Sequence, residues 1–586
     1  MFKLFRNFTK KDIIFILLSF ALIVFQVWLD LKMPDYMAEI TKLVQNEGSQ
    51  LSDILINGGY MLLCALGSLV ASIITGYFVA NAAASLSFSI RKKLFNKVEN
   101  LGMYEVKKFS TSSLITRTTN DITQIQMLIA MGLQLIIKSP ITAVWAVTKI
   151  LNKSWQWSTL TGVAVLILLT TIAILMVIVI PKFKLVQKLT DKINSITREN
   201  LTGIRVVRAF NAEKYQEDKF ENTNNELTRI QLFTQRSFSI LQPVMYLVLY
   251  FLTLLVYFIG AYLIRDALMI DKLTIFSDMI VFSSYAMQVI ISFLMLAMIF
   301  MMVPRAGVSA KRINEVLETD ESIKDGKGNV LETDDNSVEF KNVYFKYPDA
   351  EDYLLSDISF KVNKGETIAF IGATGSGKST LINLVPRFYD VTKGSILVDG
   401  VDVRDYKQEQ LRNKIGYVSQ KAVIFDGSVN YNIKYGDNGK KEVSSDQIDE
   451  SLKIAQAYDF VMELDKSKDS HIAQGGTNIS GGQKQRLSIA RAIARNPKIY
   501  IFDDSFSALD YKTDSNLRKE LKKYTKDACV LIVAQRIGTI MNADKIIVLD
   551  EGRVVGEGKH SELMKKCDVY KQIALSQLSK EELENA

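Results

Sequence analysis

The chain has 586 residues, of which 48% are hydrophobic and 23% charged, and its formal net charge is +8. The apolar content, with only eight prolines, excludes an intrinsically disordered chain. Three widely separated cysteines and two histidines argue against a disulfide framework and against a histidine-based metal site. Much of the excess basic charge lies in loops beside apolar segments, so it does not indicate a partnership with nucleic acid.

The first half of the chain contains six apolar runs, each long enough to cross a bilayer as a helix of about 20 residues. They cover residues 13–33, 55–80, 125–150, 157–180, 241–264 and 274–303. The first run is too long for a signal peptide and no small-residue cleavage site follows it, so we expect a retained helix. Residues 1–305 are therefore predicted to form an all-α transmembrane domain of six helices.

Basic residues are distributed unevenly between the loops. The N-terminal tail and loops 90–124 and 181–239 hold 22 Lys and Arg residues, whereas the three opposite loops hold four. Because basic loops remain on the cytoplasmic side, the pattern predicts a multi-pass protein of the plasma membrane with both termini in the cytoplasm.

The two long basic loops carry apolar residues at their tips. We expect the neighbouring helices to continue into the cytoplasm and turn there through short docking helices, near Phe109–Leu114 and near Ala209–Tyr215. Solvated hairpins without a partner are the alternative, but such hairpins need not expose apolar residues.

Three polar residues lie near or within the apolar runs. Lys138 precedes Ser139-Pro140 in the third run, and an intramembrane charge is a hypothesis for a functional site. The favoured interpretation is that this part of the helix faces cytoplasmic water. Asp278 and Gln288 could line a polar cavity or form hydrogen bonds between helices, and the sequence favours neither.

After the sixth run the composition changes. Residues 306–336 are rich in Gly, Asp, Glu, Lys and Asn and are interpreted as a linker. Residues 337–575 alternate short apolar β-like runs with helical segments, which predicts an α/β domain. Residues 576–586 are interpreted as a charged C-terminal tail without a recognisable motif.

A phosphate-binding loop of the form GxxxxGK[ST] follows the β-like run 367–371 and opens an apolar-periodic helix. Glycines let backbone amides approach phosphates, and the helix N-terminus adds partial positive charge. Lys378 is expected to reach the β- and γ-phosphates of a nucleotide, and Ser379 to hold Mg2+. The residues predicted to bind the nucleotide here are Gly372, Thr374, Gly375, Ser376, Gly377, Lys378, Ser379 and Thr380.

Two further motifs follow. Ser480, Gly481, Gly482 and Gln483 open a helix and form a second anion-binding end. One nucleotide does not need two such ends, so we interpret this one as facing a nucleotide held by another subunit. Asp503 ends an apolar strand and is suited to coordinating Mg2+.

Together these motifs resemble the ATP-binding cassette (ABC) transporters of the exporter type over nearly the whole chain. Ile-Ser-Gly-Gly-Gln at 479–483 matches the family signature except for its first residue. The resemblance implies a P-loop domain with a RecA-like core, an antiparallel β subdomain and a helical subdomain. It also implies a dimer that holds two ATP molecules with Mg2+ between each phosphate loop and the opposing signature.

The resemblance assigns further residues by position. Tyr347 matches the aromatic residue that stacks on adenine. Gln420 matches the glutamine that senses Mg2+ and docks the membrane half. Residues 507–510, Ser-Ala-Leu-Asp, match the loop that crosses to the partner subunit.

Three positions depart from the family pattern. Asp504 stands where the family has a catalytic glutamate, and its side chain is one methylene shorter. A misplacement of about 1 Å can cost about 100-fold in rate. Gln535 replaces the family's switch histidine and cannot gain a proton near neutral pH. Gln474 replaces a charged residue in a loop thought to contact the membrane half, which puts communication between subunits there in doubt.

The damaged hydrolysis groups beside a nearly intact signature resemble the degenerate-site subunit of bacterial heterodimeric multidrug exporters. The resulting hypothesis is ATP-driven efflux of amphipathic small molecules by a heterodimer, with hydrolysis mainly at the partner's site. A slow symmetric homodimer is one alternative, and a lipid or peptide exporter is another. A third is an ATP-gated regulator or channel.

Overall fold

The computed structural model describes residues 2–45, 48–151, 155–328, 336–436 and 442–578. The chain forms two compact units, one of residues 1–99 and 111–319, and one of residues 100–110 and 320–586. We call them the membrane unit and the nucleotide unit, and each is described by itself.

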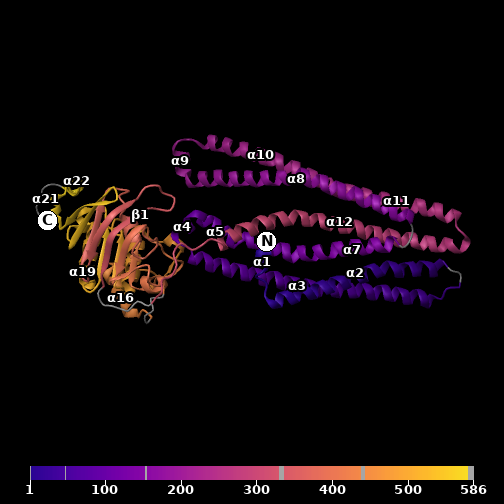
Figure 1. The fold of residues 1–586 in the computed structure, drawn as a ribbon, viewed down its shortest axis with the longest axis horizontal. Coiled ribbons are helices and arrows are strands. Elements are labelled where there is room, and N and C mark those ends of the chain that lie inside the picture. Colours follow the sequence, from indigo (N-terminus) through magenta and orange to yellow (C-terminus); the bar gives the residue numbers. More distant parts are fainter. Residues whose placement is uncertain (1, 46–47, 152–154, 329–335, 437–441, 579–586) are drawn as a thin grey trace. The chain divides into compact units, whose positions relative to one another are not determined.

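The membrane unit is all-helical (Figure 1). Its elements are α1 (Phe2–Phe5), α2 (Lys10–Gln45), α3 (Leu51–Asn100), α5 (Thr111–Thr118), α6 (Asn120–Met127), the π-helical turn η1 (Leu128–Gly132), α7 (Leu133–Leu151), α8 (Trp155–Thr202), α9 (Ile204–Ala209), α10 (Glu213–Ser239), α11 (Leu241–Asp266) and α12 (Met269–Leu317). Six helical stretches in the described residues are long and apolar enough to cross a membrane, which confirms the predicted number.

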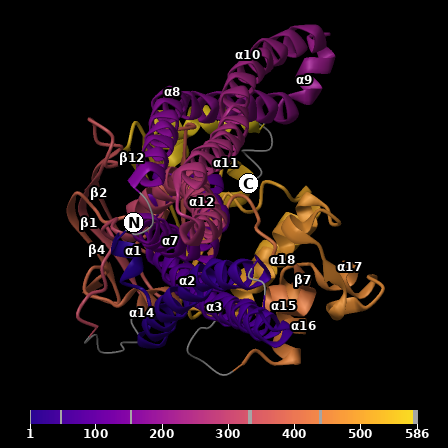
Figure 2. The same ribbon diagram turned by 90° about the vertical axis from the view of Figure 1, so that its right-hand side faces the viewer.

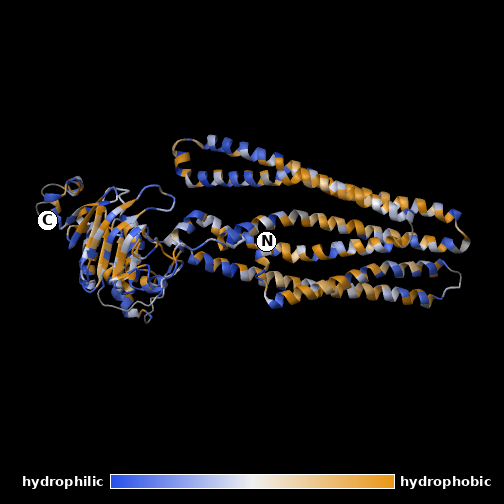
Figure 3. Cartoon of the chain, viewed as in Figure 1, coloured by the Kyte–Doolittle hydropathy of each residue, from blue (hydrophilic) through white to orange (hydrophobic). Residues whose placement is uncertain are grey.

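Hydropathy divides these helices along their length. Figure 3 shows apolar residues over the middle of the long helices and polar residues where α8, α9 and α10 meet. The helices therefore extend well past the apolar runs seen in the sequence: α8 has 48 residues and α12 has 49. Viewed from the end, the hairpin of α8, α9 and α10 lies apart from α2 and α3 (Figure 2).

The two long loops are helical, as expected. Between α3 and α5 lies the short helix α4 (Met103–Phe109), followed by Ser110 with a φ of 60°. The second turn follows α9 at residues 210–212. At that tip Val206 and Phe210 are 61% and 78% exposed, so the apolar tip is uncovered by the described part of the chain.

The nucleotide unit contains three sheets. Its strands are β1 (Val338–Phe345), β2 (Leu355–Val362), β3 (Thr367–Gly372), β4 (Lys393–Val398), β5 (Val401–Asp402), β6 (Ile415–Val418), β7 (Gly427–Ser428), β8 (His471–Ile472), β9 (Ile499–Asp503), β10 (Cys529–Val533), β11 (Lys545–Asp550) and β12 (Arg553–Gly558). The central sheet has the order β12-β11-β3-β10-β9-β6, parallel except for β12, and the antiparallel sheet has the order β2-β1-β4-β5.

Six of the described helical elements of this unit come between β6 and β9 in the sequence. The helical elements of the unit are α4, α13 (Lys378–Asn383), α14 (Gln408–Asn413), α15 (Val429–Ile433), α16 (Ser445–Ile454), α17 (Tyr458–Met462), η2 (Ser467–Asp469), η3 (Gln474–Gly476), α18 (Gly481–Ala494), α19 (Tyr511–Tyr524), α20 (Ile537–Ile540), α21 (His560–Lys566) and α22 (Asp568–Gln577). The strands β9 and β10 are buried at every residue, as expected for parallel strands covered on both faces. The predicted class, six membrane helices followed by an α/β P-loop domain, is confirmed.

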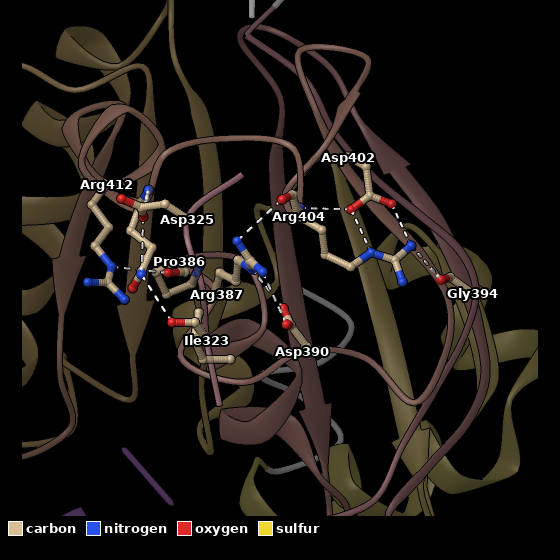
Figure 4. A network of polar contacts seen from close by, with 10 residues as sticks. Ile323, Asp325, Pro386, Arg387, Asp390, Gly394, Asp402, Arg404 and Arg412 are labelled. Atoms are coloured by element: carbon tan, nitrogen blue, oxygen red, sulfur yellow. Dashed lines mark hydrogen bonds and ion pairs between the residues drawn. The ribbon is translucent and has the colours of Figure 1, made fainter. Parts of the chain in front are cut away.

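The region predicted as a linker, 306–336, is divided by the structure. Helix α12 continues to Leu317, and residues 320–328 belong to the nucleotide unit. There Asp325 accepts hydrogen bonds from the backbone and the side chain of Gln408, while Arg412 and Arg387 bind neighbouring backbone and carboxylate oxygens (Figure 4). Composition alone missed this division, because polar residues continue a helix as readily as they form a loop.

The boundary of the predicted tail, 576–586, also differs from the structure. Ser576 and Gln577 form the last turn of α22, so the folded domain extends past residue 575. Residues 579–586 lie outside the described residues.

Candidate nucleotide site

The phosphate-loop residues lie between β3 and α13. Gly377 has a φ of 93°, and a Cβ there would lie 2.6 Å from Leu355 Cδ2, so this turn requires glycine. Lys378 is buried, and its Nζ donates to the backbone oxygens of Gly372 and Ala373 at 2.8 and 2.7 Å. Burial lowers the pKa of the Lys378 ammonium, and the Asp504 and Asp503 carboxylates oppose that shift.

Asp503 lies at the carboxyl end of β9 beside the start of α13. The Ser379 hydroxyl donates to Asp503 Oδ1 at 2.7 Å. Burial raises the pKa of the Asp503 carboxyl, and the Ser379 hydrogen bond opposes the rise. A hydroxyl and a carboxylate side by side are hard oxygen ligands of the kind that Mg2+ prefers, so the donor set fits the predicted cation.

Asp504, Gln420 and Gln535 come from three neighbouring parallel strands and meet at their carboxyl ends. Gln535 Nε2 donates to Asp504 Oδ2 at 2.9 Å, and Gln420 Nε2 donates to the same oxygen at 3.2 Å. The Asp504 backbone N–H is bonded to Val533 O at 2.9 Å, which fixes the residue beside β10. Its φ of 46° lies in the left-handed region that Asp adopts more readily than most residues.

The Asp504 carboxylate therefore accepts hydrogen bonds from neutral side-chain donors. Burial raises the pKa of its carboxyl, and the hydrogen bond from Gln420 acts in the opposite direction. Neither carboxamide can take up a proton near neutral pH.

Tyr347 lies beside the phosphate loop, with its hydroxyl 3.0 Å from Thr380 Oγ1. Its ring meets the ring of Tyr389 edge-on, with 5.3 Å between centroids. Helix α4 adds Lys107, whose Nζ lies 5.9 Å from the Tyr347 ring centroid, and Tyr104, whose hydroxyl donates to Asp349 at 2.6 Å. A docking helix in this loop is expected from its apolar residues, but no motif in the sequence marks Lys107.

The signature residues form the start of α18 and are bonded among themselves. Gln483 N donates to Ser480 Oγ at 3.3 Å, and Ser480 N donates to Gln483 Oε1 at 2.8 Å, which is a capping box. Ser480 and Gly481 are exposed, and within the described residues no hydrogen bond joins this end to the phosphate loop. The structure brings the phosphate loop together with Asp503, Asp504, Gln420, Gln535 and Tyr347, but not with the signature.

The loop before the signature has its own geometry. Gln474 opens η3, and Gly475, with a φ of 69°, donates its N–H to Ile424 O at 3.1 Å. Beyond β9, the Ser507 hydroxyl donates to Asp504 O at 2.9 Å, and Asp510 caps α19 by accepting from Thr513 N at 3.0 Å. Segment 507–510 therefore begins with a direct bond to the backbone of Asp504.

The membrane unit holds a second polar group, which we call the polar seam: Asp30, Asp35, Lys138, Lys149 and Tyr285. Lys138 pairs with Asp30 at 3.1 Å and Lys149 pairs with Asp35 at 2.8 Å. The Tyr285 hydroxyl lies 2.5 Å from Asp35 Oδ1. The seam joins α2 to α7 and α12.

Lys138 thus has a carboxylate partner from another helix, and its side chain is only 29% exposed. The contact does not test the favoured interpretation, in which this part of the helix faces cytoplasmic water. Gln288 Nε2 donates to Asp30 O at 3.4 Å, which is the helix–helix alternative for that residue. Asp278 is half-buried on α12, and neither alternative for it is tested.

The fold and this site define a multi-pass membrane protein that carries one P-loop nucleotide-binding domain. Residues 15–293 match the ABC transporter transmembrane region, and residues 355–507 match the ABC transporter family. An uncharacterized ABC transporter ATP-binding protein of Mycobacterium tuberculosis is 36% identical over 522 residues, covering 89% of this chain and 87% of the relative. The chain belongs to the ABC transporters of the exporter type, and its ATP-binding domain is that of an ATPase coupled to transport.

Two further comparisons describe neighbours of the chain. The ATP-dependent lipid A-core flippase of Pseudomonas fluorescens is 32% identical over 516 residues, covering 87% of this chain and 83% of the relative. A bacterial Atm1-family ABC exporter with ATP bound has a similar fold, with a TM-score of 0.78, 24% identity and 96% coverage of both chains.

Proposed function

We propose that the chain is one half of a heterodimeric exporter and that its own site binds ATP but hydrolyses it slowly. The carrying observation is the environment of Asp504, whose Oδ2 accepts from two carboxamides. A general base must reach the proton that it removes, and it needs a partner that can exchange protons. Here the Asp504 side chain is one methylene shorter than that of glutamate, and the residue at the switch position, Gln535, carries an amide.

The binding residues support retention of nucleotide. Lys378 is held only by neutral oxygens of its own loop, so its charge remains available for phosphates. Ser379 and Asp503 would hold Mg2+, and Tyr347 would contact the base. ATP bound with Mg2+ would supply the phosphoanhydride whose binding and hydrolysis drive transport.

The second subunit is proposed from two exposed surfaces. Ser480 and Gly481, at the N-terminus of the 14-residue helix α18, offer backbone donors to a nucleotide held by the partner. The apolar tip of α9, with Val206 and Phe210 exposed, fits a docking contact with the partner's nucleotide-binding domain. The excess of Lys and Arg in one set of loops supports the proposal that both termini lie in the cytoplasm of a bacterial cell.

The proposed cargo is an amphipathic small molecule or drug. A lipid cargo is the second candidate, because a relative at 32% identity is named a lipid A-core flippase. An ATP-gated regulator or channel is the third.

The test is ATP turnover by the purified chain alone and by the chain co-expressed with the product of its neighbouring gene. We expect only the pair to be active at normal exporter rates. Comparable turnover by the chain alone would make it a homodimer and would restore Asp504 as a base. Uphill movement of a fluorescent drug or a labelled lipid by the pair in proteoliposomes then separates the two cargo classes. ATP turnover without uphill movement would favour the regulator.

A further inference from the structure

The C-terminal helix reaches the switch position. Gln577, the last residue of α22, makes two hydrogen bonds to the segment after β10. Its Oε1 accepts from Ile537 N at 2.8 Å, and its Nε2 donates to Gln535 O at 2.7 Å. One carboxamide thus holds the backbone on both sides of Arg536.

The helix that presents Gln577 is firmly seated. Tyr570 and Ala574 are fully buried in the core cluster that also contains Ile537 and Ile540 of α20. The Tyr570 hydroxyl lies 2.6 Å from His560 Nδ1, which ties α22 to α21. Gln577 therefore acts from a fixed helix, although its own side chain is exposed.

The segment that Gln577 holds packs into the core through Ile537, but its first turn receives no hydrogen bond from a capping side chain of its own. Arg536 is the N-cap of α20, and its side chain makes no capping hydrogen bond. Helix α20 has four residues, too short to hold its own first turn. Gln577 supplies an acceptor for the Ile537 N–H in that turn and a donor for the Gln535 carbonyl before it.

We propose that Gln577 is a positioning residue for the nucleotide site. It fixes the backbone of Gln535 so that the Gln535 carboxamide meets Asp504 at 2.9 Å. The C-terminal helix is thereby part of the site's support, and its displacement would release the switch residue. This inference stands whether the chain's own turnover is slow or fast.

The test replaces Gln577 in the full chain with its partner subunit. Gln577→Met keeps the length of the side chain and loses both bonds. Gln577→Glu keeps the acceptor for Ile537 N–H and loses the donor to Gln535 O. The matched control is Gln572→Met, at another exposed position of α22, since the Gln572 side chain makes no hydrogen bond within the described residues.

Amide hydrogen exchange without nucleotide is the first readout. We expect faster exchange at the Ile537 amide in Gln577→Met, near-normal exchange in Gln577→Glu, and no change in Gln572→Met. Equal exchange in Gln577→Met and Gln572→Met would overturn the proposal.

ATP turnover in a double-mutant cycle is the second readout. We expect Gln577→Met and Gln577→Glu each to change turnover at this chain's own site about 5-fold, the order of a hydrogen bond, at an unchanged melting temperature; a pair whose partner site is inactivated isolates that turnover. In a Gln535→Ala background the same substitutions should have no further effect, because Gln577 acts through Gln535. Equal effects in both backgrounds would show that Gln577 only supports the fold, and the positioning role would be wrong.

Discussion

The nucleotide site and the polar seam, one in each unit of this exporter, treat buried charge in opposite ways. In the nucleotide unit, the buried Lys378 ammonium is held by backbone oxygens and a hydroxyl, and Asp504 is held by two carboxamides. In the membrane unit, Lys138 and Lys149 each face a carboxylate at 3.1 and 2.8 Å. No ion pair involving Lys378 is found among the described residues.

The difference follows from what each charge must do. A charge that will meet a ligand gains affinity if neutral groups hold it until the ligand arrives. A charge in an apolar layer has no such ligand and must be neutralised by the fold itself, because a single charge there is expensive. The nucleotide site therefore keeps the charge of Lys378 available, while the polar seam uses its charges to join α2 with α7 and α12.

The largest effect that this comparison predicts is at Lys378. Lys378→Ala should weaken ATP binding to this chain's site by about 100-fold or more, the order for removing a buried charge from an ionic contact. The melting temperature should change little, because no carboxylate loses a partner. Labelled-ATP binding to the assembled pair measures the first quantity.

Lys361→Ala, at an exposed lysine on β2, is the control and should bind ATP normally. If Lys378→Ala retains nucleotide at this site, the charge of Lys378 is not held for phosphate.

The next effect concerns Ser480. Ser480→Arg should lower ATP turnover by the pair at least about 10-fold, because a bulky cation would occupy the place where the partner's nucleotide meets α18. Turnover of the pair is the measurement.

The chain offers a close control in Ser444. Like Ser480, it is an N-cap with a capping box, here with Gln447 on α16. Ser444→Arg loses a comparable cap, worth about 1 kcal/mol, and should leave turnover nearly unchanged. Equal losses in the two variants would refute the role of Ser480 across the interface.

A third prediction addresses the polar seam. Lys138→Met leaves Asp30 with the Ser68 hydroxyl, 2.6 Å away, but without its ammonium. Breaking one side of such a pair costs about 3 kcal/mol, so the apparent melting temperature in lipid nanodiscs should fall. The double variant Asp30→Asn, Lys138→Met should recover most of that loss, since no unpaired charge remains.

Lys42→Met, in an i,i+3 pair with Glu39 on the exposed end of α2, is the control and should cost at most about 1 kcal/mol. If the double variant is as unstable as the single one, the pair does more than cancel charge, and Lys138 becomes a candidate contact for cargo.

The two units also differ in how much could be predicted from the sequence. The phosphate loop and Asp503 could be found because each motif is contiguous and lies at a strand end with a known geometry. Gln420 and Gln535 could be placed only through resemblance, since parallel strands far apart in sequence bring them to Asp504. The six helices were predictable from apolar length alone.

The contacts that the sequence missed all depend on tertiary packing. Asp30 lies 108 positions from Lys138 in the numbering, and Gln577 lies 42 from Gln535, and neither pair has a sequence signature. The linker was misplaced because its composition describes solvent exposure and does not decide between helix and loop. Hydropathy likewise located Lys138 but could not supply its partner.

The smallest effect is predicted at Asp504. Asp504→Asn keeps the shape of the side chain and suits the left-handed backbone, for which Asn is favoured. If this carboxylate is not a working base, turnover by the pair should change less than about 10-fold. Asp503→Asn is the matched control, with the same chemical change one residue earlier, and it should reduce Mg2+-dependent ATP binding because Asp503 and Ser379 would hold the cation. A loss of about 100-fold in Asp504→Asn, or about 2.7 kcal/mol, would identify Asp504 as a base. That result would place its charge, like the Lys378 charge, among those that the nucleotide unit keeps available for chemistry.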